Sequence, residues 1–143
     1  MNNFNLNLSK VSEIWLSIHV THFLYHLIMI ILYGIPNCNS VKKAMDWLTE
    51  NQIDFQFHNY KKQGITLEKL TTWLAFTSWE KLLNRAGTTY KKLSDEEKAS
   101  ITDASSAMEW LIKQNSMIKR PILEANGKLL VGFDEQAYQE LFA

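Results

Sequence analysis

The stretch ILYGIPNCNSVKKAMDWL (Ile31–Leu48) changes its hydrophobic period halfway along. An apolar, partly β-branched run over Met29–Tyr33 comes first, and Gly34 and Pro36 end it, which is typical of a buried strand. Over residues 39–51 the apolar side chains recur at helical spacing, which predicts a helix with one apolar face. These apolar positions are Val41, Ala44, Met45 and Leu48.

The single cysteine of the chain, Cys38, lies in the loop between this strand and this helix. Free backbone N–H groups and the positive end of the helix dipole stabilise an anion at a helix N-terminus, and Lys42 and Lys43 follow closely. Such surroundings lower a thiol pKa from ~8.5 toward or below neutrality and produce the attacking thiolate. The alternative is a small buried core residue, which is common for cysteine. The neighbouring loop and cap residues favour a reactive thiol.

The residue three positions after Cys38 is Val41, so the chain lacks the second thiol of a CxxC motif. Cys38 is therefore predicted to act as a monothiol. Any disulfide that it forms must include an external thiol, such as glutathione or a partner protein. A single cysteine also excludes an internal disulfide framework and a multi-cysteine zinc site. We expect no bound cofactor or metal, and a reducing, cytoplasmic setting.

The composition is that of one folded domain. The chain has 143 residues, of which 46% are hydrophobic and 21% charged, so it is long and apolar enough to bury a core. Lys plus Arg and Asp plus Glu are equal at 15 each, and a balanced chain carries no overall electrostatic signature of nucleic-acid binding. We expect a monomer that does not bind nucleic acid directly.

Further periodic segments complete an α/β pattern. The alternating run Ile53–Tyr60 predicts a second strand, and a β-α-β start implies two parallel strands. Residues 121–131 indicate a hairpin around the turn Ala125–Gly127. The sequence therefore predicts a mixed four-stranded sheet with helices on its faces and a helical subdomain inserted at about 65–115. Helices are predicted over 66–76 (with Leu67, Leu70 and Leu74 on the packed face), 78–84, from Ser94, over 104–112 and over 138–142.

The segment Ile14–Tyr33 contains no Asp, Glu, Lys or Arg and is about long enough to span a bilayer. The interpretations are a membrane anchor or signal peptide, an amphipathic helix packed on the domain, and an extension upstream of the functional domain. We favour the extension, because Ile30–Tyr33 is needed as a core strand and no linker precedes it. Residues 1–28 then lie outside a domain over 29–143, and a start codon assigned too early would account for them.

Three histidines of this segment, His19, His22 and His26, are spaced to share one face of a helix. No acidic or cysteine partner joins them on that face. We therefore predict no metal site there, and we do not expect the protein to act at a membrane.

Several blocks of the chain carry a family resemblance. In order and spacing they resemble the ArsC/Spx family of thioredoxin-fold proteins, and most closely its YffB-like branch. The blocks are YGIPNC with VKKA, then LLNRAGTTYKKL, IKRPIL and GKLLVGF. The resemblance runs from about Met29 to the C-terminus. It implies a thioredoxin/glutaredoxin-like core with an inserted helical subdomain. It also implies that Cys38 is the reactive cysteine, that Arg120 lies beside the thiol and that Pro121 is the family's usually cis proline.

The chain departs from the arsenate reductases of this family at several functional positions. It has Gly34 where they have a histidine, Asn84 where they have an arginine, and Val41 where they have a serine. A further arginine is missing near residues 132–133. Stabilising a bound arsenate takes several convergent donors, so arsenate reduction is disfavoured. Val41 also removes the CxxC switch that Spx-type regulators often carry.

We therefore expect a monothiol thiol–disulfide oxidoreductase that uses glutathione as co-substrate or exchanges with a thiol or disulfide partner protein. The Cys38 thiolate is the predicted nucleophile, and Arg120 is predicted to stabilise and orient the anion. An Spx-like transcriptional regulator that binds RNA polymerase, and an arsenate reductase, are the alternative functions.

Substrate contacts are expected from residues next to the thiol and from positions that the resemblance brings near it. Thr88 and Thr89 follow Gly87 in a motif-like loop and are candidates to line the active-site cleft, and the alternative for both is an ordinary turn role. For Arg120 the alternative is an exposed, solvated charge. The expected substrate-binding residues are Asn37, Asn39, Ser40, Thr88 and Pro121.

Overall fold

A four-stranded mixed sheet forms the centre of the fold. The computed structural model describes the backbone of residues 8–143 and the side chains of residues 10–21 and 29–143. β1 pairs in parallel with β2, and the β1–β3 and β3–β4 pairs are antiparallel. The predicted mixed sheet and its closing hairpin are confirmed. The strands, in the spatial order β2-β1-β3-β4, are β1 (Ile31–Gly34), β2 (Gln56–Asn59), β3 (Ile122–Ala125) and β4 (Lys128–Val131).

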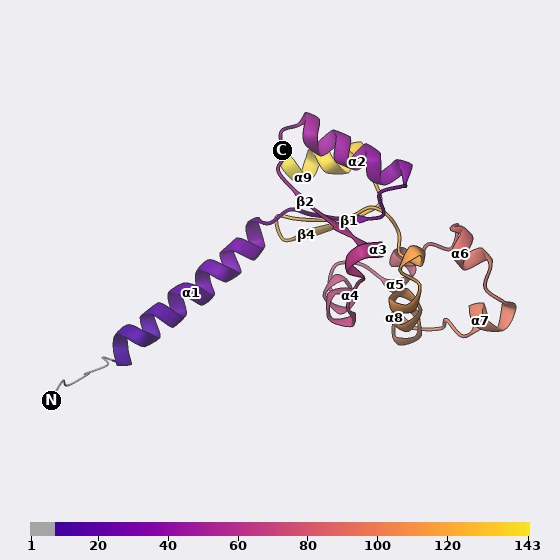
Figure 1. The fold of residues 1–143 in the computed structure, drawn as a ribbon, viewed down its shortest axis with the longest axis horizontal. Helices are drawn as coiled ribbons and strands as arrows, with labels where there is room; N and C mark the ends of the chain where they lie inside the picture. The colour runs from indigo at the N-terminus through magenta and orange to yellow at the C-terminus, as the bar shows by residue number, and fades with distance from the viewer. Residues whose placement is uncertain (1–7) are drawn as a thin grey trace.

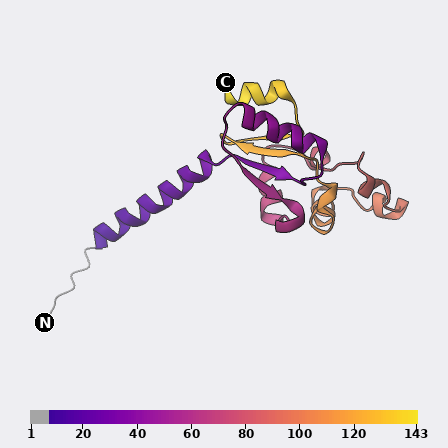
Figure 2. The same ribbon diagram turned by 45° about the horizontal axis from the view of Figure 1, so that its top comes forward.

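Helices cover both faces of the sheet (Figure 1, Figure 2). α2 (Asn39–Glu50) and α9 (Glu135–Phe142) lie together on one face, and inserted helices lie on the other. Successive strand residues point to opposite faces, so Leu32 packs with α2 and α9 while Tyr33 packs with the inserted helices. The inserted elements are α3 (Tyr60–Gln63), α4 (Leu67–Trp73), α5 (Trp79–Leu82), α6 (Thr88–Lys91), α7 (Asp95–Ala99), α8 (Ala104–Lys113) and the 3-10 helix η1 (Asn115–Met117).

Side-chain caps set the beginning of several inserted helices. The Ser94 hydroxyl accepts from the Glu97 N–H while the Glu97 carboxylate accepts from the Ser94 N–H, which confirms the predicted capping box. Thr66 caps α4 by accepting from the backbone N–H of Lys69. These caps satisfy N–H groups that have no partner within the helix, so even the short helices have defined starts.

The structure corrects two details of the predicted elements. The predicted strand over Ile53–Tyr60 is paired only over β2, and Ile53 and Phe55 pack on the α2–α9 side before the pairing begins. In α4 the packed face also differs from the prediction. Leu67 is 55% exposed, while Trp73 is 1% exposed and packs with the buried Leu70 against the sheet. The position of the sheet relative to α4 decides which face of the helix is packed, and the spacing of the leucines alone does not reveal that face.

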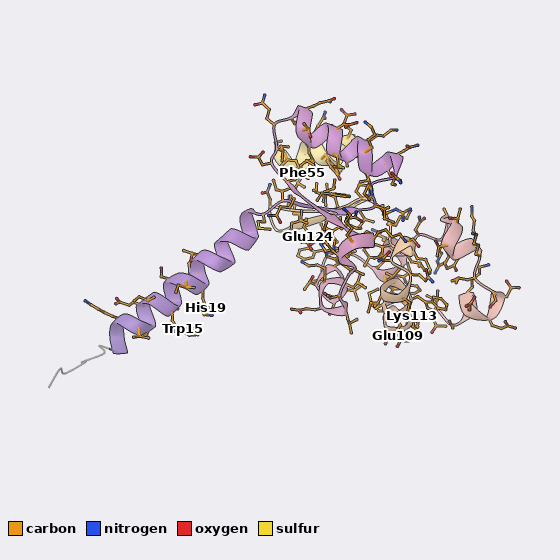
Figure 3. All side chains as sticks on the ribbon, in the orientation of Figure 1. Trp15, His19, Phe55, Glu109, Lys113 and Glu124 are labelled. Atoms are coloured by element: carbon orange, nitrogen blue, oxygen red, sulfur yellow. The ribbon has the colours of Figure 1, made fainter. Side chains whose placement is uncertain are left out.

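The N-terminal helix α1 (Leu8–Ile28) leads away from the sheet (Figure 1). Its described side chains, over residues 10–21, are all exposed, so this part of the helix does not pack on the domain. His19 Nδ1 lies 2.8 Å from the Trp15 carbonyl oxygen, and the two rings stack (Figure 3). His22 and His26 lie outside the described side chains.

Within residues 8–143, no helix combines the length and the apolar character needed to cross a membrane. Among the described side chains, no group of three or more His, Cys, Asp or Glu converges in a way that would hold a metal ion.

Candidate active site

The sheet topology brings three segments to one edge. Gly34 at the end of β1 pairs with Asn59 at the end of β2, and Tyr33 pairs with Ile122 at the beginning of β3. The loop after β1, the short helix after β2 and the residues that precede β3 therefore lie next to one another. Cys38 belongs to the first of these segments and Arg120 to the third.

Cys38 is the N-cap residue of α2. Its backbone is extended (φ −141°, ψ 122°), and its carbonyl oxygen accepts the first helical hydrogen bond from the Lys42 N–H at 2.9 Å. The side chain is half-buried and forms no disulfide. The sulfur is therefore free for chemistry at the N-terminus of a helix of more than three turns.

Hydrogen bonds lower the pKa of the Cys38 thiol below its ordinary value. Partial burial is the largest influence and acts in the opposite direction, because it disfavours the charged form. The effect of burial is outweighed by hydrogen bonds to the thiol from the Ser40 hydroxyl, the Val41 N–H and the Arg120 side chain. The Ser40 N–H makes a further contribution. The direction agrees with the prediction from the helix N-terminus. The lysines are not among the causes, and Lys42 binds Asp46 at 2.6 Å instead.

The Ser40 hydroxyl lies between the thiol and the beginning of β3. Its oxygen is 3.2 Å from Cys38 Sγ, and it donates its hydrogen to the Arg120 carbonyl oxygen at 3.2 Å. Since a hydroxyl has a single hydrogen, the thiol must donate to Ser40 in this arrangement. A thiolate only accepts, so ionisation turns the Ser40 hydrogen toward sulfur and releases the Arg120 carbonyl. Ser40 thereby couples the charge of Cys38 to the backbone beside Pro121.

Arg120 is held by a chain of contacts from the inserted subdomain. Its Nη1 donates to the Ser116 carbonyl oxygen at 2.9 Å, and the Ser116 and Thr89 hydroxyl oxygens are 2.9 Å apart. The Arg120–Pro121 peptide bond is cis, as the family resemblance implied. Sequence reasoning named Thr89 with Thr88 as a candidate to line the cleft, but it missed Ser116, because the contact between Thr89 and Ser116 depends on α6 and η1 packing together. The local signal for the contact between Arg120 and the Ser116 carbonyl was the spacing of four residues between them.

Two buried polar atoms at this site have no hydrogen-bond partner among the described residues, Arg120 Nε and the Tyr60 hydroxyl. The two groups are close enough to influence each other. Burial raises the pKa of the Tyr60 hydroxyl well above its ordinary range, and the Arg120 charge opposes this. Buried polar groups are rarely left unpaired, so both groups keep hydrogen-bonding capacity that the described residues do not use.

The other predicted substrate-binding residues surround the thiol unequally. Asn37 and Asn39 are exposed on either side of Cys38. Pro121 is buried, and its carbonyl oxygen accepts from the Gly132 N–H at 2.7 Å. Thr88 is exposed at the beginning of α6, while its neighbour Thr89 takes part in the chain that reaches Arg120. The contacts of these residues with a substrate stay predictions.

The structure gives a steric reason for one departure from the arsenate reductase pattern. A Cβ atom built on Gly34 would lie 2.7 Å from Val41 Cγ2, and Val41 is fully buried. A histidine at position 34 therefore has no room while valine occupies position 41. Arg85, which follows the missing arginine position, lies over the Trp79 ring with Cζ 5.8 Å from its centroid. Its guanidinium is thus engaged on α5 instead.

The sequence profile of the ArsC family matches residues 33–141, which include the thiol loop and the residues before β3. The chain belongs to the ArsC family. Cys38, Ser40 and Arg120 all fall inside the matched region.

Individual proteins resemble the chain over most of its length. The YFFB (PA3664) protein has a solved structure that is 46% identical, with a TM-score of 0.77, covering 80% of this chain and all of its own. An uncharacterised protein of Haemophilus influenzae is 40% identical over 115 residues, which is 80% of this chain and its whole length. The global transcriptional regulator Spx of Streptococcus pyogenes is 31% identical over 110 residues, or 75% of this chain and 80% of its own. The expected thioredoxin-like fold class is confirmed.

Proposed function

We propose that this ArsC family member is a monothiol thiol–disulfide oxidoreductase that uses glutathione. Cys38 is the nucleophile, Ser40 and Arg120 stabilise its thiolate, and glutathione regenerates it. The observation that carries the proposal is the set of hydrogen bonds that lowers the pKa of a half-buried, accessible thiol at the beginning of α2. A chain with one cysteine has no internal resolving thiol, so an external thiol must complete the cycle.

The proposed cycle has two exchange steps. The Cys38 thiolate attacks the glutathione sulfur of a mixed disulfide; a Cys38–glutathione disulfide forms, and the substrate sulfur leaves as a thiolate with the electron pair of the broken bond. A glutathione thiolate then attacks that disulfide, which releases oxidised glutathione and the Cys38 thiolate. The substrate is reduced, and two glutathione units end as one disulfide. Because reduced glutathione is required, the cytoplasm is the proposed place of action.

Turnover of a small mixed disulfide tests this proposal. The full chain is supplied with the disulfide of glutathione and 2-mercaptoethanol, reduced glutathione, glutathione reductase and NADPH, and NADPH consumption is followed. We expect turnover that depends on glutathione and is absent in Cys38→Ser. Mass spectrometry of the acid-quenched protein should find glutathione on Cys38. An ordinary thiol pKa from the pH dependence of iodoacetamide alkylation, together with no turnover, would contradict the proposal.

A transcriptional regulator is the second candidate, favoured by the Spx relative at 31% identity. In this role the same fold would bind RNA polymerase without turnover. A pull-down with the full chain that captures RNA polymerase subunits, equally well for Cys38→Ser, supports the regulator. Capture of no polymerase subunit, with turnover intact, supports the oxidoreductase.

Arsenate reduction has less support in the geometry. Val41 closes the space beside Gly34, and Arg85 lies over Trp79 instead of being free for an oxyanion. An assay of arsenate-dependent glutathione oxidation checks this directly. We expect no rate above the Cys38→Ser background.

A further inference from the structure

Lys and Arg residues are concentrated in the chain segments that meet at the edge of the sheet that holds Cys38. These segments are residues 34–45, 59–67, 82–93 and 115–123; they contain none of the 15 acidic residues of the chain, and Asp46, Glu68 and Glu124 directly follow three of them. The segments contain nine of the 15 Lys and Arg residues. A chain without net charge therefore has one strongly basic region. We name these nine residues the basic rim: Lys42, Lys43, Lys61, Lys62, Arg85, Lys91, Lys92, Lys119 and Arg120.

Backbone pairing and side-chain contacts tie the four segments together. The Gly34–Asn59 pair makes the loops after β1 and β2 leave the sheet at the same edge. The antiparallel bridge between Leu83 and Ile118 lays residues 82–84 beside 117–119, directly before Arg120. The Thr89–Ser116 hydroxyl contact adds α6. Figure 1 shows α3, α6 and the beginning of α2 toward one end of the sheet, opposite to α1.

The basic rim is open to a ligand. All its members are exposed except the half-buried Arg120. Lys42 is paired with Asp46 on its own helix, and the other ion pair found among the described residues, Lys69–Glu124, lies outside the rim. Most rim cations thus have no carboxylate partner within the described part of the molecule. Unpaired cations around a nucleophile attract anions, and the attraction falls as salt screens it.

We propose that the basic rim selects the partner of Cys38, and that this partner is an acidic peptide segment with carboxylates on both sides of the cysteine that Cys38 attacks. The proposal deepens the proposed function and rests on it only in requiring disulfide exchange at Cys38. Glutathione has a net charge of about −1 near neutral pH, because its carboxylates are partly offset by its amino group. It would leave most of the rim unneutralised. A segment with several Asp or Glu residues matches the charge of the rim.

The exchange with such a segment differs from the glutathione cycle in the sulfur that is attacked, which is the peptide sulfur here and the glutathione sulfur there. The Cys38 thiolate attacks the peptide sulfur, and a bond between Cys38 Sγ and that sulfur forms. The bond between the peptide sulfur and its former partner breaks. The former partner leaves with the electron pair and is reduced, while Cys38 becomes part of the mixed disulfide.

Two synthetic peptides of equal length test the proposal. Each has one cysteine activated as a 2-thiopyridyl disulfide; four Glu residues surround it in one peptide and four Gln residues in the other. The full chain reacts in a single turnover without glutathione, and released thiopyridone is measured by absorbance. Each rate is divided by the rate of the same peptide with 2-mercaptoethanol, which removes differences in intrinsic reactivity. We expect the Glu peptide to react about tenfold faster at low ionic strength.

Salt and charge variants make the test specific. In about 1 M salt, where the Debye length is about 3 Å, the preference should disappear. The double variants Lys61→Gln/Lys62→Gln and Lys91→Gln/Lys92→Gln should each reduce it about two- to threefold, with the Gln-peptide rate unchanged. The control Lys10→Gln/Lys128→Gln removes the same charge from α1 and from the hairpin turn, and it should keep the full preference.

Three outcomes would overturn the proposal: equal rates for the two peptides, an equal loss in the control variant, or a preference that salt does not change. A single-stranded oligonucleotide that blocks the Glu-peptide reaction at an equimolar amount would assign the rim to nucleic acid and overturn it as well. The peptide preference is measured without glutathione. Absence of glutathione turnover therefore bears on the proposed function alone.

Discussion

Two polar clusters lie on the same strands of the sheet and differ in how completely their groups are hydrogen-bonded. On β3, the Glu124 carboxylate accepts from the Tyr33 hydroxyl at 3.0 Å, from the Lys69 ammonium at 3.2 Å and from the Trp73 indole N–H. Just before the same strand, Arg120 Nε and the Tyr60 hydroxyl are buried without a partner among the described residues. The Glu124 cluster is satisfied, while the Cys38–Arg120 site is not.

This difference separates a structural role from a chemical one. Glu124 connects the sheet to α4, which supplies Lys69 and Trp73, and Figure 3 marks it on the sheet. Burial, with the Glu124 charge and hydrogen bond, holds the pKa of the Tyr33 hydroxyl far above its ordinary range, so this hydroxyl stays a donor. Completely paired groups rigidify a fold. Arg120 Nε is buried without a partner, so it keeps hydrogen-bonding capacity that the described residues do not use.

The largest expected effect is the loss of chemistry in Cys38→Ser. We expect the rate of disulfide exchange to fall at least about 10³-fold, because the serine hydroxyl is not ionised near neutral pH and cannot form the disulfide. Unfolding in urea should change by less than about 0.5 kcal/mol, since the half-buried thiol makes few packing contacts. A large loss of stability would mean that Cys38 belongs with Glu124 as a structural residue.

The opposite pattern is expected for Glu124→Ala. Removing the carboxylate leaves the Tyr33, Lys69 and Trp73 donors without their acceptor, and we expect about 2–4 kcal/mol of destabilisation. Urea unfolding followed by tryptophan fluorescence measures it. The iodoacetamide rate of Cys38 in the folded protein should remain within about twofold of the original, because Glu124 does not contact the thiol.

Glu109→Ala is the matched control for Glu124→Ala. Glu109 is an exposed carboxylate on α8 (Figure 3), and its removal should change stability by no more than about 0.5 kcal/mol. Equal destabilisation of the two variants would show that the Glu124 cluster contributes nothing beyond an ordinary surface charge. The distinction between the two clusters would then fail.

Gly34→Ala tests the packing that closes one side of the active site. The added Cβ meets Val41 Cγ2 at 2.7 Å, so strand β1 or helix α2 must shift, and we expect a cost of about 1–3 kcal/mol. In the Val41→Ala background the same change should cost less, by about 1 kcal/mol or more, since the clashing methyl groups are gone. Four denaturation curves complete this double-mutant cycle. If Gly34→Ala lowers the free energy of unfolding equally in both backgrounds, a clash with Val41 does not explain why position 34 lacks a histidine.

The parts of the fold that local sequence determines could be predicted. The thiol loop between β1 and α2 followed from the change of hydrophobic period, and the Ser94 capping box followed from spacing. The hairpin turn followed from Asn126 and Gly127, whose positive φ angles of 53° and 69° suit a two-residue turn. In each case the residues that decide the structure are neighbours in sequence.

The parts that depend on distant contacts could not be predicted. Thr89 and Ser116 are far apart in the chain, and only the packing of α6 against η1 brings their hydroxyls together. The prediction placed Thr88 and Thr89 together in the motif-like loop, but it did not reveal that Ser116 is the partner of Thr89. The Glu124 cluster was likewise missed, since the partners Tyr33, Lys69 and Trp73 come from two other elements. The local sequence places Tyr33 in a buried strand, but it does not show that Tyr33, Lys69 and Trp73 meet at Glu124.

The smallest expected effect concerns Ser40, the residue that links the thiol to the beginning of β3. Ser40→Ala removes the hydroxyl that stabilises the thiolate, so the pKa of the Cys38 thiol should rise toward its ordinary value. A raised pKa leaves less thiolate near neutral pH. The iodoacetamide rate at pH 7 should therefore fall about fivefold, while the rate above about pH 10, where both proteins are ionised, should be nearly equal.

Ser40→Thr separates this hydrogen bond from packing, because it keeps the hydroxyl. We expect its rate against pH to follow that of the original protein, with the midpoint at lower pH than in Ser40→Ala. If both variants shift the midpoint equally, the thiolate owes its stability to the backbone N–H groups of α2 and to Arg120. The Cys38–Arg120 site would then contain no hydroxyl that responds to the charge of the thiol, and Arg120 would be the remaining side chain that stabilises the thiolate.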